Sequence, residues 1–228
     1  MVGKKQRLII AIDGPAGSGK SSTAKALARR LKLPYIDTGA MYRALTLEVM
    51  RRKIPFESIA KIAKLARGVR IRFGPVRFDS QKVYLNGRDV TKAIRTPQLT
   101  KNVFRVAREP RLRREMVKKQ RQLGKKHGAV MEGRDIGSVV FPKADYKFYF
   151  DAEPGLRAKR RWRELVAAGK RVRLAEVRRE IFERDKSDCE RKQGALKVAR
   201  AARVLDTTGL TIGATVDKIL AILRGPAK

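Results

Sequence analysis

The ten residues DGPAGSGKSS at positions 13–22 constrain the fold of this chain more than any other stretch. They contain the pattern G-x-x-x-x-G-K-[ST] and stand between an apolar run, RLIIAID (7–13), and a segment with helical spacing, KSSTAKALARRL (20–31). A strand, a glycine loop and a helix in that order let backbone amides converge on phosphate oxygens. A glycine-rich turn that arose by chance would lack these neighbours. The stretch therefore predicts a loop that holds the phosphates of ATP or GTP.

Two side chains of this loop have expected roles in nucleotide binding. Lys20 would reach the β- and γ-phosphates, and the Ser21 hydroxyl would be a ligand of Mg²⁺. The full set of residues expected to bind the donor is Gly14, Pro15, Ala16, Gly17, Ser18, Gly19, Lys20, Ser21 and Ser22.

The loop alone does not identify what receives the phosphate, because motors, GTPases and small kinases share it. The chain contains no NKxD string of the kind with which GTPases read guanine. Its 228 residues also leave no room for the second core domain of a helicase. Together these two observations favour a small kinase.

The rest of the chain alternates between strand and helix patterns. Strands are expected at 7–13, 33–39, 128–132, 146–151 and 203–208, and helices at 20–31, 40–53, 56–66, 98–107, 110–124, from 153 and at 215–224. This alternation predicts an α/β fold with a mostly parallel sheet covered on both faces. Residues 68–94 differ, because they alternate residue by residue and carry turn signals at Gly74–Pro75 and Asn86–Gly87. They predict a small β-rich insertion.

The composition adds one unusual feature, a formal net charge of +34 from 56 Lys and Arg against 22 Asp and Glu. Such a field attracts polyanions, either nucleotides or nucleic acids. The basic residues are spread over helices without interleaved aromatic residues, so solvated helix faces with weak RNA affinity are the favoured interpretation. The lone Cys189 and the absence of a long apolar run favour a cytoplasmic protein without a membrane segment. His127 is expected in a solvated loop.

Charged residues at the ends of two further strands are candidates for the acceptor site. Asp37 and Thr38 end the second strand, Arg43 follows on the next helix, and Arg134 and Asp135 follow the strand at 128–132. Ligands of open parallel sheets bind beyond the carboxyl ends of the strands. Arginine would suit a second phosphate, and aspartate would suit sugar hydroxyls, ring amines or waters on Mg²⁺. The alternative is that Arg134 and Asp135 only form a structural ion pair.

Seven blocks of the sequence together resemble the bacterial cytidylate kinase (CMP kinase) family of nucleoside monophosphate kinases. They are GPAGSGKSS, YIDTGAMYRA, the RTP of AIRTPQL, PRLRREMVKKQR, GRDIGSVVFPKADYKFYFDA, RAKRRWREL and the run ERD-x-x-D-x-x-R, which ends at Arg191. The blocks cover about residues 8–208, nearly the whole chain.

The resemblance implies a P-loop NTPase fold with three α/β/α layers, a central parallel five-stranded sheet, a small β-rich nucleoside-monophosphate-binding (NMP-binding) insertion and a helical lid. The implied boundaries are a core at 1–66, 98–160 and 200–228, the insertion at 67–97 and the lid at 161–199. The lid is expected to stay open without nucleotide, because its many cations repel each other.

The family also implies a reaction, the transfer of the γ-phosphate of ATP to CMP or dCMP with Mg²⁺. The implied acceptor residues are Asp37, Thr38, Arg43, Phe104, Arg113, Arg134, Asp135, Arg184, Asp188 and Arg191. Lys20, Arg134, Asp135 and Arg184 would form the catalytic set, and Arg157 and Arg161 would close over ATP. We expect a monomer with small nucleotides as partners and no obligate nucleic-acid or membrane partner.

The chain departs from the family's pattern at two places near the acceptor. Phe104 stands where the family often has a serine close to the cytosine, and Glu132 stands where it often has an aspartate. Phe104 would either stack on a pyrimidine or pack in the core, and the core is favoured. A P-loop protein that binds nucleic acid, or a kinase of another small phosphorylated substrate, remains the alternative.

Overall fold

The computed structural model describes residues 7–77 and 80–225. Residues 1–6, 78–79 and 226–228 lie outside the described residues. They include both ends of the predicted core and a part of the predicted insertion.

The centre of the molecule is a sheet of five parallel strands in the order β2-β6-β1-β7-β8. The strands are β1 (Ile9–Asp13), β2 (Tyr35–Asp37), β6 (Ala129–Gly133), β7 (Tyr146–Asp151) and β8 (Arg203–Asp206). All five residues of β1 are buried, as expected for a strand with helices on both faces. The predicted parallel sheet with two covered faces is confirmed.

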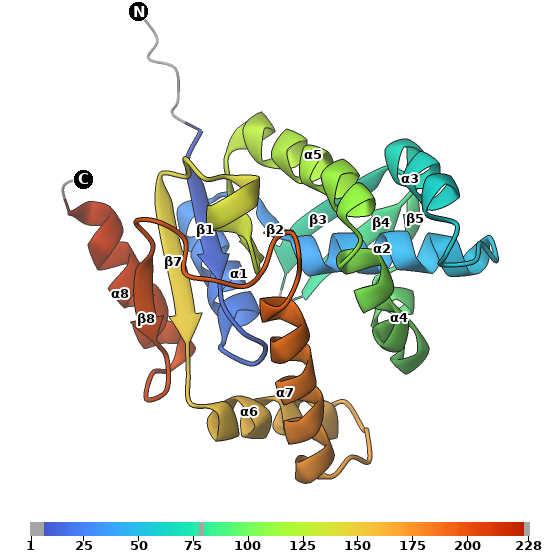
Figure 1. Ribbon diagram of the computed structural model, residues 1–228. Coiled ribbons are helices and arrows are strands. Elements are labelled where there is room, and N and C mark those ends of the chain that lie inside the picture. Colours follow the sequence, from blue (N-terminus) through green and yellow to red (C-terminus); the bar gives the residue numbers. More distant parts are fainter. Residues whose placement is uncertain (1–6, 78–79, 226–228) are drawn as a thin grey trace, which may run out of the picture.

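Helices cover the two faces of this sheet and form two separate cores (Figure 1). On one face, α1 (Lys20–Leu31) and α8 (Ile212–Arg224) bury Leu27 and Ile219 against Ile10 and Ile12 of β1. On the other face, α2 (Thr38–Arg51) and α5 (Pro110–His127) pack over Ala11. Successive residues of β1 thus enter opposite cores, which gives the three α/β/α layers.

Proline and capping side chains set where several helices begin. Pro97 and Pro110 occupy the first turns of α4 (Pro97–Ala107) and α5, and Pro110 separates these helices as the sequence predicted. Proline suits this position because a first-turn N–H has no partner within the helix. The chain therefore changes direction at 108–109, and His127 ends α5 as an exposed helical residue rather than a loop residue.

The β-rich insertion forms a separate antiparallel sheet in the order β3-β4-β5. Its elements are β3 (Ile71–Arg77), β4 (Ser80–Leu85), β5 (Arg88–Asp89) and the short η1 helix (Ala93–Arg95), and α3 (Ile59–Gly68) precedes them. The predicted turn at Gly74–Pro75 is wrong, because both residues lie inside β3, where the pairing register shifts between Phe73 and Val76. Glycine and proline mark strand irregularities as well as turns.

Two helices, α6 (Pro154–Ala167) and α7 (Leu174–Cys189), lie below the end of β7 in Figure 1 and pack mainly on each other. Their small core contains Ala158, Val177 and Ile181, with Ala16 of the phosphate loop. These helices correspond to the predicted lid, whose expected start at residue 161 falls inside α6.

The strand register places the predicted site segments at one edge of the sheet. Asp13 pairs with Gly133 and Asp37 pairs with Glu132, so β1, β2 and β6 end side by side. The segments that follow these strands therefore share one edge, which is where ligands bind in open parallel sheets. Within the described residues, no helix has the length and apolarity to cross a membrane.

We predict that Phe150→Ala destabilises the protein far more than Phe182→Ala. Phe150 is fully buried between the sheet and α1, whereas Phe182 on α7 is 64% exposed. Loss of a buried phenylalanine costs about 3–5 kcal/mol, because a cavity remains. An exposed substitution changes stability by about 0.5 kcal/mol or less. Urea unfolding of both variants measures the difference, and equal losses would contradict the assigned core.

Candidate functional site

The phosphate loop connects β1 to α1 and needs glycine at two close approaches. Gly14 has a φ of 147°, and a Cβ there would lie 2.2 Å from the carbonyl oxygen of Phe150. Gly17 has a φ of 75°, and a Cβ there would lie 2.7 Å from the carbonyl oxygen of Arg157. No other residue fits either place without moving the backbone. The loop therefore has the predicted strand–loop–helix form, fixed by its contacts with β7 and α6.

Lys20 begins α1 and turns its amine back into the loop. The amine Nζ donates to the carbonyl oxygen of Pro15 and, at 3.1 Å, to Oγ of Ser18. The side chain is 5% exposed. Burial, followed by the nearby charge of Arg134, lowers the pKa of Lys20 to about 7. The amine thus lies in the loop with little anionic compensation, as expected for a group that meets phosphate.

Oxygen atoms gather around Glu132 on β6. Its carboxylate accepts hydrogen bonds from Tyr35 and, at 2.9 Å, from Oγ of Ser21, and its carbonyl accepts from Oγ1 of Thr38 at 2.7 Å. Burial and the neighbouring charge of Asp37 raise the pKa of Glu132. Hard oxygen atoms with unrelieved negative charge form the donor set that Mg²⁺ prefers. The predicted metal residue Ser21 thus lies beside the carboxylate of Glu132, which could act with it.

Arg134 and Asp135 follow β6 but do not pair with each other. Nε of Arg134 donates to Oδ2 of Asp188 on α7 at 2.6 Å, and Asp188 also pairs with Arg191. Burial alone would raise the pKa of Asp188, but Arg134 and Arg191 outweigh it and lower this pKa. The alternative of a local Arg134–Asp135 ion pair is therefore wrong, and Arg134 instead joins the segment after β6 to α7.

Asp135 forms a buried ion pair with Arg113 of α5. Arg113 also donates from Nη1 to the carbonyl oxygen of Ala107 at 3.0 Å, and its guanidinium lies 5.5 Å from the ring centroid of Tyr42. The Tyr42 hydroxyl is buried and has no hydrogen-bond partner in the described structure. This corner of the site offers one carboxylate, one guanidinium and one free hydroxyl.

Arg43 lies on α2 and points toward the insertion. Its Nη1 donates to Oγ1 of Thr100 on α4 at 2.8 Å and to the carbonyl oxygen of Ile94 at 3.2 Å. Asp37 caps the same helix by accepting from the amide of Ala40 at 2.9 Å. The cap holds α2 so that Thr38 and Arg43, five residues apart, stand near the common strand edge.

Arg184 has no hydrogen bond or ion pair to the described residues. Its side chain is exposed, yet protein atoms surround it closely enough that desolvation and then the charge of Arg134 lower its pKa to about 10. Arg43 and Arg161 also act on this pKa. Four guanidinium groups therefore approach one region, which is favourable only for an anion.

Arg157 and Arg161, predicted to close over a nucleotide, lie in different surroundings. Arg157 is buried, donates at 3.0 Å to the carbonyl oxygens of Ala152 and Ala16, and pairs with Asp185 of α7. Asp185 in turn accepts from the amide of Ala16 at 3.0 Å. Arg157 thus connects the phosphate loop to α7, whereas Arg161 is exposed and pairs with Glu164 at 2.9 Å.

Phe104 is 44% exposed on α4, so the favoured expectation that it packs in the core is wrong. It lies four residues after Thr100, which accepts a hydrogen bond from Arg43. Residues four apart share one face of a helix. Arg108 stands over its ring at 5.4 Å from the centroid. The aromatic ring is therefore displayed on the helix face that also contacts Arg43.

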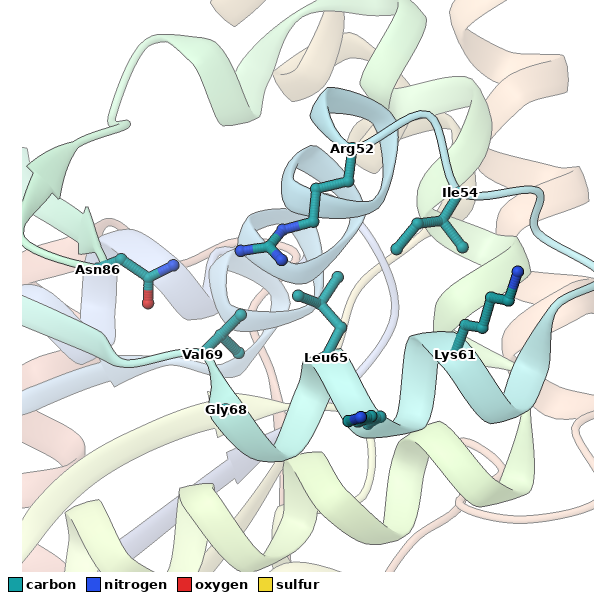
Figure 2. A pocket seen from close by; sticks show the side chains of 8 residues that line it. Arg52, Ile54, Lys61, Leu65, Gly68, Val69 and Asn86 are labelled. Carbon is teal, nitrogen blue, oxygen red and sulfur yellow. The ribbon is translucent and has the colours of Figure 1, made fainter.

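The best-defined hollow lies away from these residues. It has a volume of about 360 Å³ and lies where α2 ends, opposite Thr38 at the other end of that helix (Figure 2). Its lining residues are Arg52, Ile54, Lys61, Lys64, Leu65, Gly68, Val69 and Asn86. None of the predicted site residues lines this hollow, so it is not the predicted site.

Sequence reasoning missed three residues that organise the site, namely Asp13, Tyr35 and Asp185. Each was present in a quoted motif, since Asp13 precedes the phosphate loop, Tyr35 begins YIDTG and Asp185 ends ERD. Their partners lie 123, 97 and 169 residues away in the chain. No local pattern specifies contacts of that separation.

Three comparisons bear on this geometry. The family model described as cytidylate kinase matches residues 10–225. A protein of Desulfitobacterium hafniense called cytidylate kinase is 45% identical over 220 residues, which are 96% of this chain and 94% of that protein. A bifunctional pantoate ligase/cytidylate kinase of a Synechococcus species is 43% identical over 96% of this chain, and the match spans only 41% of that longer protein.

Among solved structures, an uncharacterised protein of Eubacterium ventriosum has a TM-score of 0.53 to this chain. It is 13% identical, and the match covers 96% of this chain and 99% of that protein. This likeness concerns the fold alone.

We predict that Lys20 takes up a proton at pH 8 when a polyphosphate binds at the loop. The pKa of Lys20 is about 7 in the free protein, and phosphate oxygens favour the ammonium form and raise this pKa. The affinity should therefore fall by up to about tenfold per unit as pH rises above 7. Calorimetry of ATP binding in two buffers with different ionisation enthalpies measures the uptake. Identical heats in both buffers would contradict it, and Lys20→Ala should abolish it.

Proposed function

The chain belongs to the cytidylate kinase family, and on that premise we propose that it transfers the γ-phosphate of ATP to CMP or dCMP, giving CDP or dCDP and ADP. One observation carries the proposal. Asp13 pairs in register with Gly133. The phosphate loop, which follows β1, and residues Arg134 and Asp135, which follow β6, therefore lie at the same edge of one sheet. The proposed donor and acceptor sites would thereby adjoin, as direct transfer between two nucleotides requires.

On the donor side, the loop amides from Gly14 to Ser21 and the Lys20 amine would hold the phosphates of ATP. Ser21, Glu132 and Asp37 would supply oxygen ligands for a magnesium ion. Burial and then the charge of Asp37 raise the pKa of Glu132, and a cation beside it would favour the carboxylate form. When bound, Mg²⁺ would neutralise charge on the phosphate oxygens. Arg157 would act on the donor through the loop that it fastens, and Arg161 would reach the nucleotide from α6.

On the acceptor side, Arg43, Arg134 and Arg191 would bind the phosphate of CMP. Asp188 lies between Arg134 and Arg191, so it is placed to accept from sugar hydroxyls while it orients both guanidinium groups. Arg113 and Asp135 offer one donor and one acceptor group to the base or the sugar, near Thr38. Binding of both nucleotides would then order α7, which carries Arg184, Asp188 and the lid's contact to the phosphate loop.

Transfer itself would depend on charge stabilisation rather than on proton abstraction. Lys20, Arg134 and Arg184 surround the place where the two nucleotides would meet, and Lys20 feels the charge of both arginines. Fixed cations aimed at the transferring phosphoryl group stabilise its transition state, because no reorientation is needed during the reaction. Asp135 completes the proposed catalytic set by holding Arg113 in place.

Further expectations belong to the same proposal. We infer a cytoplasmic monomer with a core at 1–66, 98–160 and 200–228, an NMP-binding insertion at 67–97 and a lid at 161–199. The surplus positive charge would give weak, salt-dependent RNA affinity without a functional role. The competing proposal is a nucleic-acid-binding P-loop protein, which would need no monophosphate for its activity.

A coupled assay of ADP release across CMP, dCMP, UMP and AMP tests the function. We expect release that depends on CMP or dCMP, and a loss of about 100-fold or more in Lys20→Ala, by analogy with removal of one donor from a charge-stabilising site. Lys218→Ala on the exposed face of α8 is the matched control and should behave as wild type. Release that is indifferent to monophosphate but stimulated by RNA would favour the nucleic-acid-binding alternative.

We further predict that Phe104→Ser raises the KM for CMP while kcat at saturation is retained. If the exposed ring stacks on the base, its loss should cost roughly tenfold in KM, since stacking contributes about 1–3 kcal/mol per base. Ile212→Ser, which removes a similarly exposed apolar residue from α8, is the control. An unchanged KM for CMP in Phe104→Ser would exclude a contact with the base.

A further inference from the structure

One buried carboxylate connects the donor and acceptor segments. Asp13 is the last residue of β1, directly before the phosphate loop, and is 3% exposed. Its Oδ1 accepts from the amide of Ile136 at 2.8 Å and its Oδ2 accepts from the amide of Gly137 at 2.7 Å. Both oxygens of a residue on the donor side are therefore used to hold backbone on the acceptor side.

The two amides belong to the first turn of η2 (Ile136–Val140), which begins immediately after Arg134 and Asp135. The first amides of a helical turn have no partner within it and need an external acceptor. Asp135 stands at the capping position of η2, but its side chain makes no capping hydrogen bond and pairs with Arg113 instead. Asp13 supplies the cap from another strand, and the Asp135 carboxylate is thereby left to pair with Arg113.

The ionisation of Asp13 is consistent with this double acceptance. Burial raises its pKa to about 6, while the amides of Gly137 and Ile136 favour the charged form. At neutral pH the group is mainly a carboxylate, with both oxygens able to accept. An amide side chain of the same shape could accept from only one N–H and would turn its own NH₂ group against the other.

We propose that Asp13 is a positioning residue for the acceptor nucleotide, which acts by locking the Arg134–Asp135 segment to the strand that carries the phosphate loop. The inference rests on the proposed kinase function. It assigns Asp13 no contact with either nucleotide. Its effect passes through the backbone of Ile136 and Gly137 to the two side chains that precede them.

The alternative is that Asp13 only stabilises the fold, and the chain provides a control for it. At the opposite end of β1, Oδ2 of Asp145 accepts from the amide of Ile9 at 2.7 Å. Asp145 thus makes the same kind of carboxylate–amide bond to the same strand, far from the carboxyl edge. If Asp13 has only a structural role, Asp13→Asn and Asp145→Asn should have the same kinetics and should differ only in how much stability they lose.

The experiment compares full-length wild type, Asp13→Asn and Asp145→Asn by steady-state kinetics and thermal unfolding. We expect Asp13→Asn to raise the KM for CMP and lower kcat by about 10- to 100-fold, as for misplacement of reacting groups without loss of contacts. The KM for ATP should stay at the wild-type value. Asp145→Asn should lower the unfolding temperature only.

Gly137→Ala is a second variant that keeps the carboxylate and the charge. Its Cβ would lie 3.3 Å from side-chain carbons of Lys147 and Ala199 and 3.4 Å from Oδ2 of Asp13, so Gly137 and these neighbours have to shift slightly relative to one another. We expect the same acceptor-selective change at smaller size. If Asp13→Asn does not fold, the KM of Gly137→Ala for CMP tests the positioning role instead.

Three results would overturn the positioning role. They are KM values for CMP and ATP that rise equally in Asp13→Asn, kinetics in Asp13→Asn that match Asp145→Asn, and a wild-type KM for CMP in Gly137→Ala. If the wild-type protein itself releases no ADP with any monophosphate, the proposed function fails and this inference fails with it. An active wild type with an unaffected Asp13→Asn refutes the inference alone.

Discussion

The parallel pairing of β1 with β6 is the contact on which the site depends. It joins residues about 120 positions apart in register, so that the loop after Asp13 and the segment after Gly133 leave the sheet side by side. Burial of β1 on both faces holds this register, because Ile10 and Ile12 enter the core under α1 and α8 while Ala11 enters the core under α2 and α5. Loss of either helical layer would expose one side of the strand and weaken the pairing.

The charged side chains at the sheet edge are tolerated because the carboxylates of Asp135, Asp185 and Asp188 each pair with one or two arginines. Asp188 pairs with two arginines, Asp135 with one, and Asp185 with Arg157 and a loop amide. Burying these groups is costly unless each is paired and hydrogen-bonded. Within the described residues, Lys20 and Arg184 form no such ion pair, and desolvation and the charge of Arg134 lower the pKa of each. The uncompensated positive charge therefore lies where the phosphates of the proposed substrates would meet.

The sequence was informative wherever a local pattern determines the structure. The spacing of RLIIAID and KSSTAKALARRL and the glycines between them suffice for the phosphate loop, and Pro110 suffices to separate α4 from α5. Local patterns failed at Gly74–Pro75, where these residues mark a strand irregularity, and at Phe104, where helical spacing does not say which face is covered. The partners of Glu132, Asp185 and Asp13 depend on strand order and on the docking of α7, which no short pattern encodes.

The pairing of Asp188 with both Arg134 and Arg191 also has a consequence for the binding of an anion. Each guanidinium has five N–H donors and uses only part of them on the carboxylate. The remaining donors are therefore held in a fixed direction before any anion arrives. A phosphate in the proposed acceptor site would bind preorganised arginines, and less side-chain entropy would be lost on binding than with free, mobile arginines.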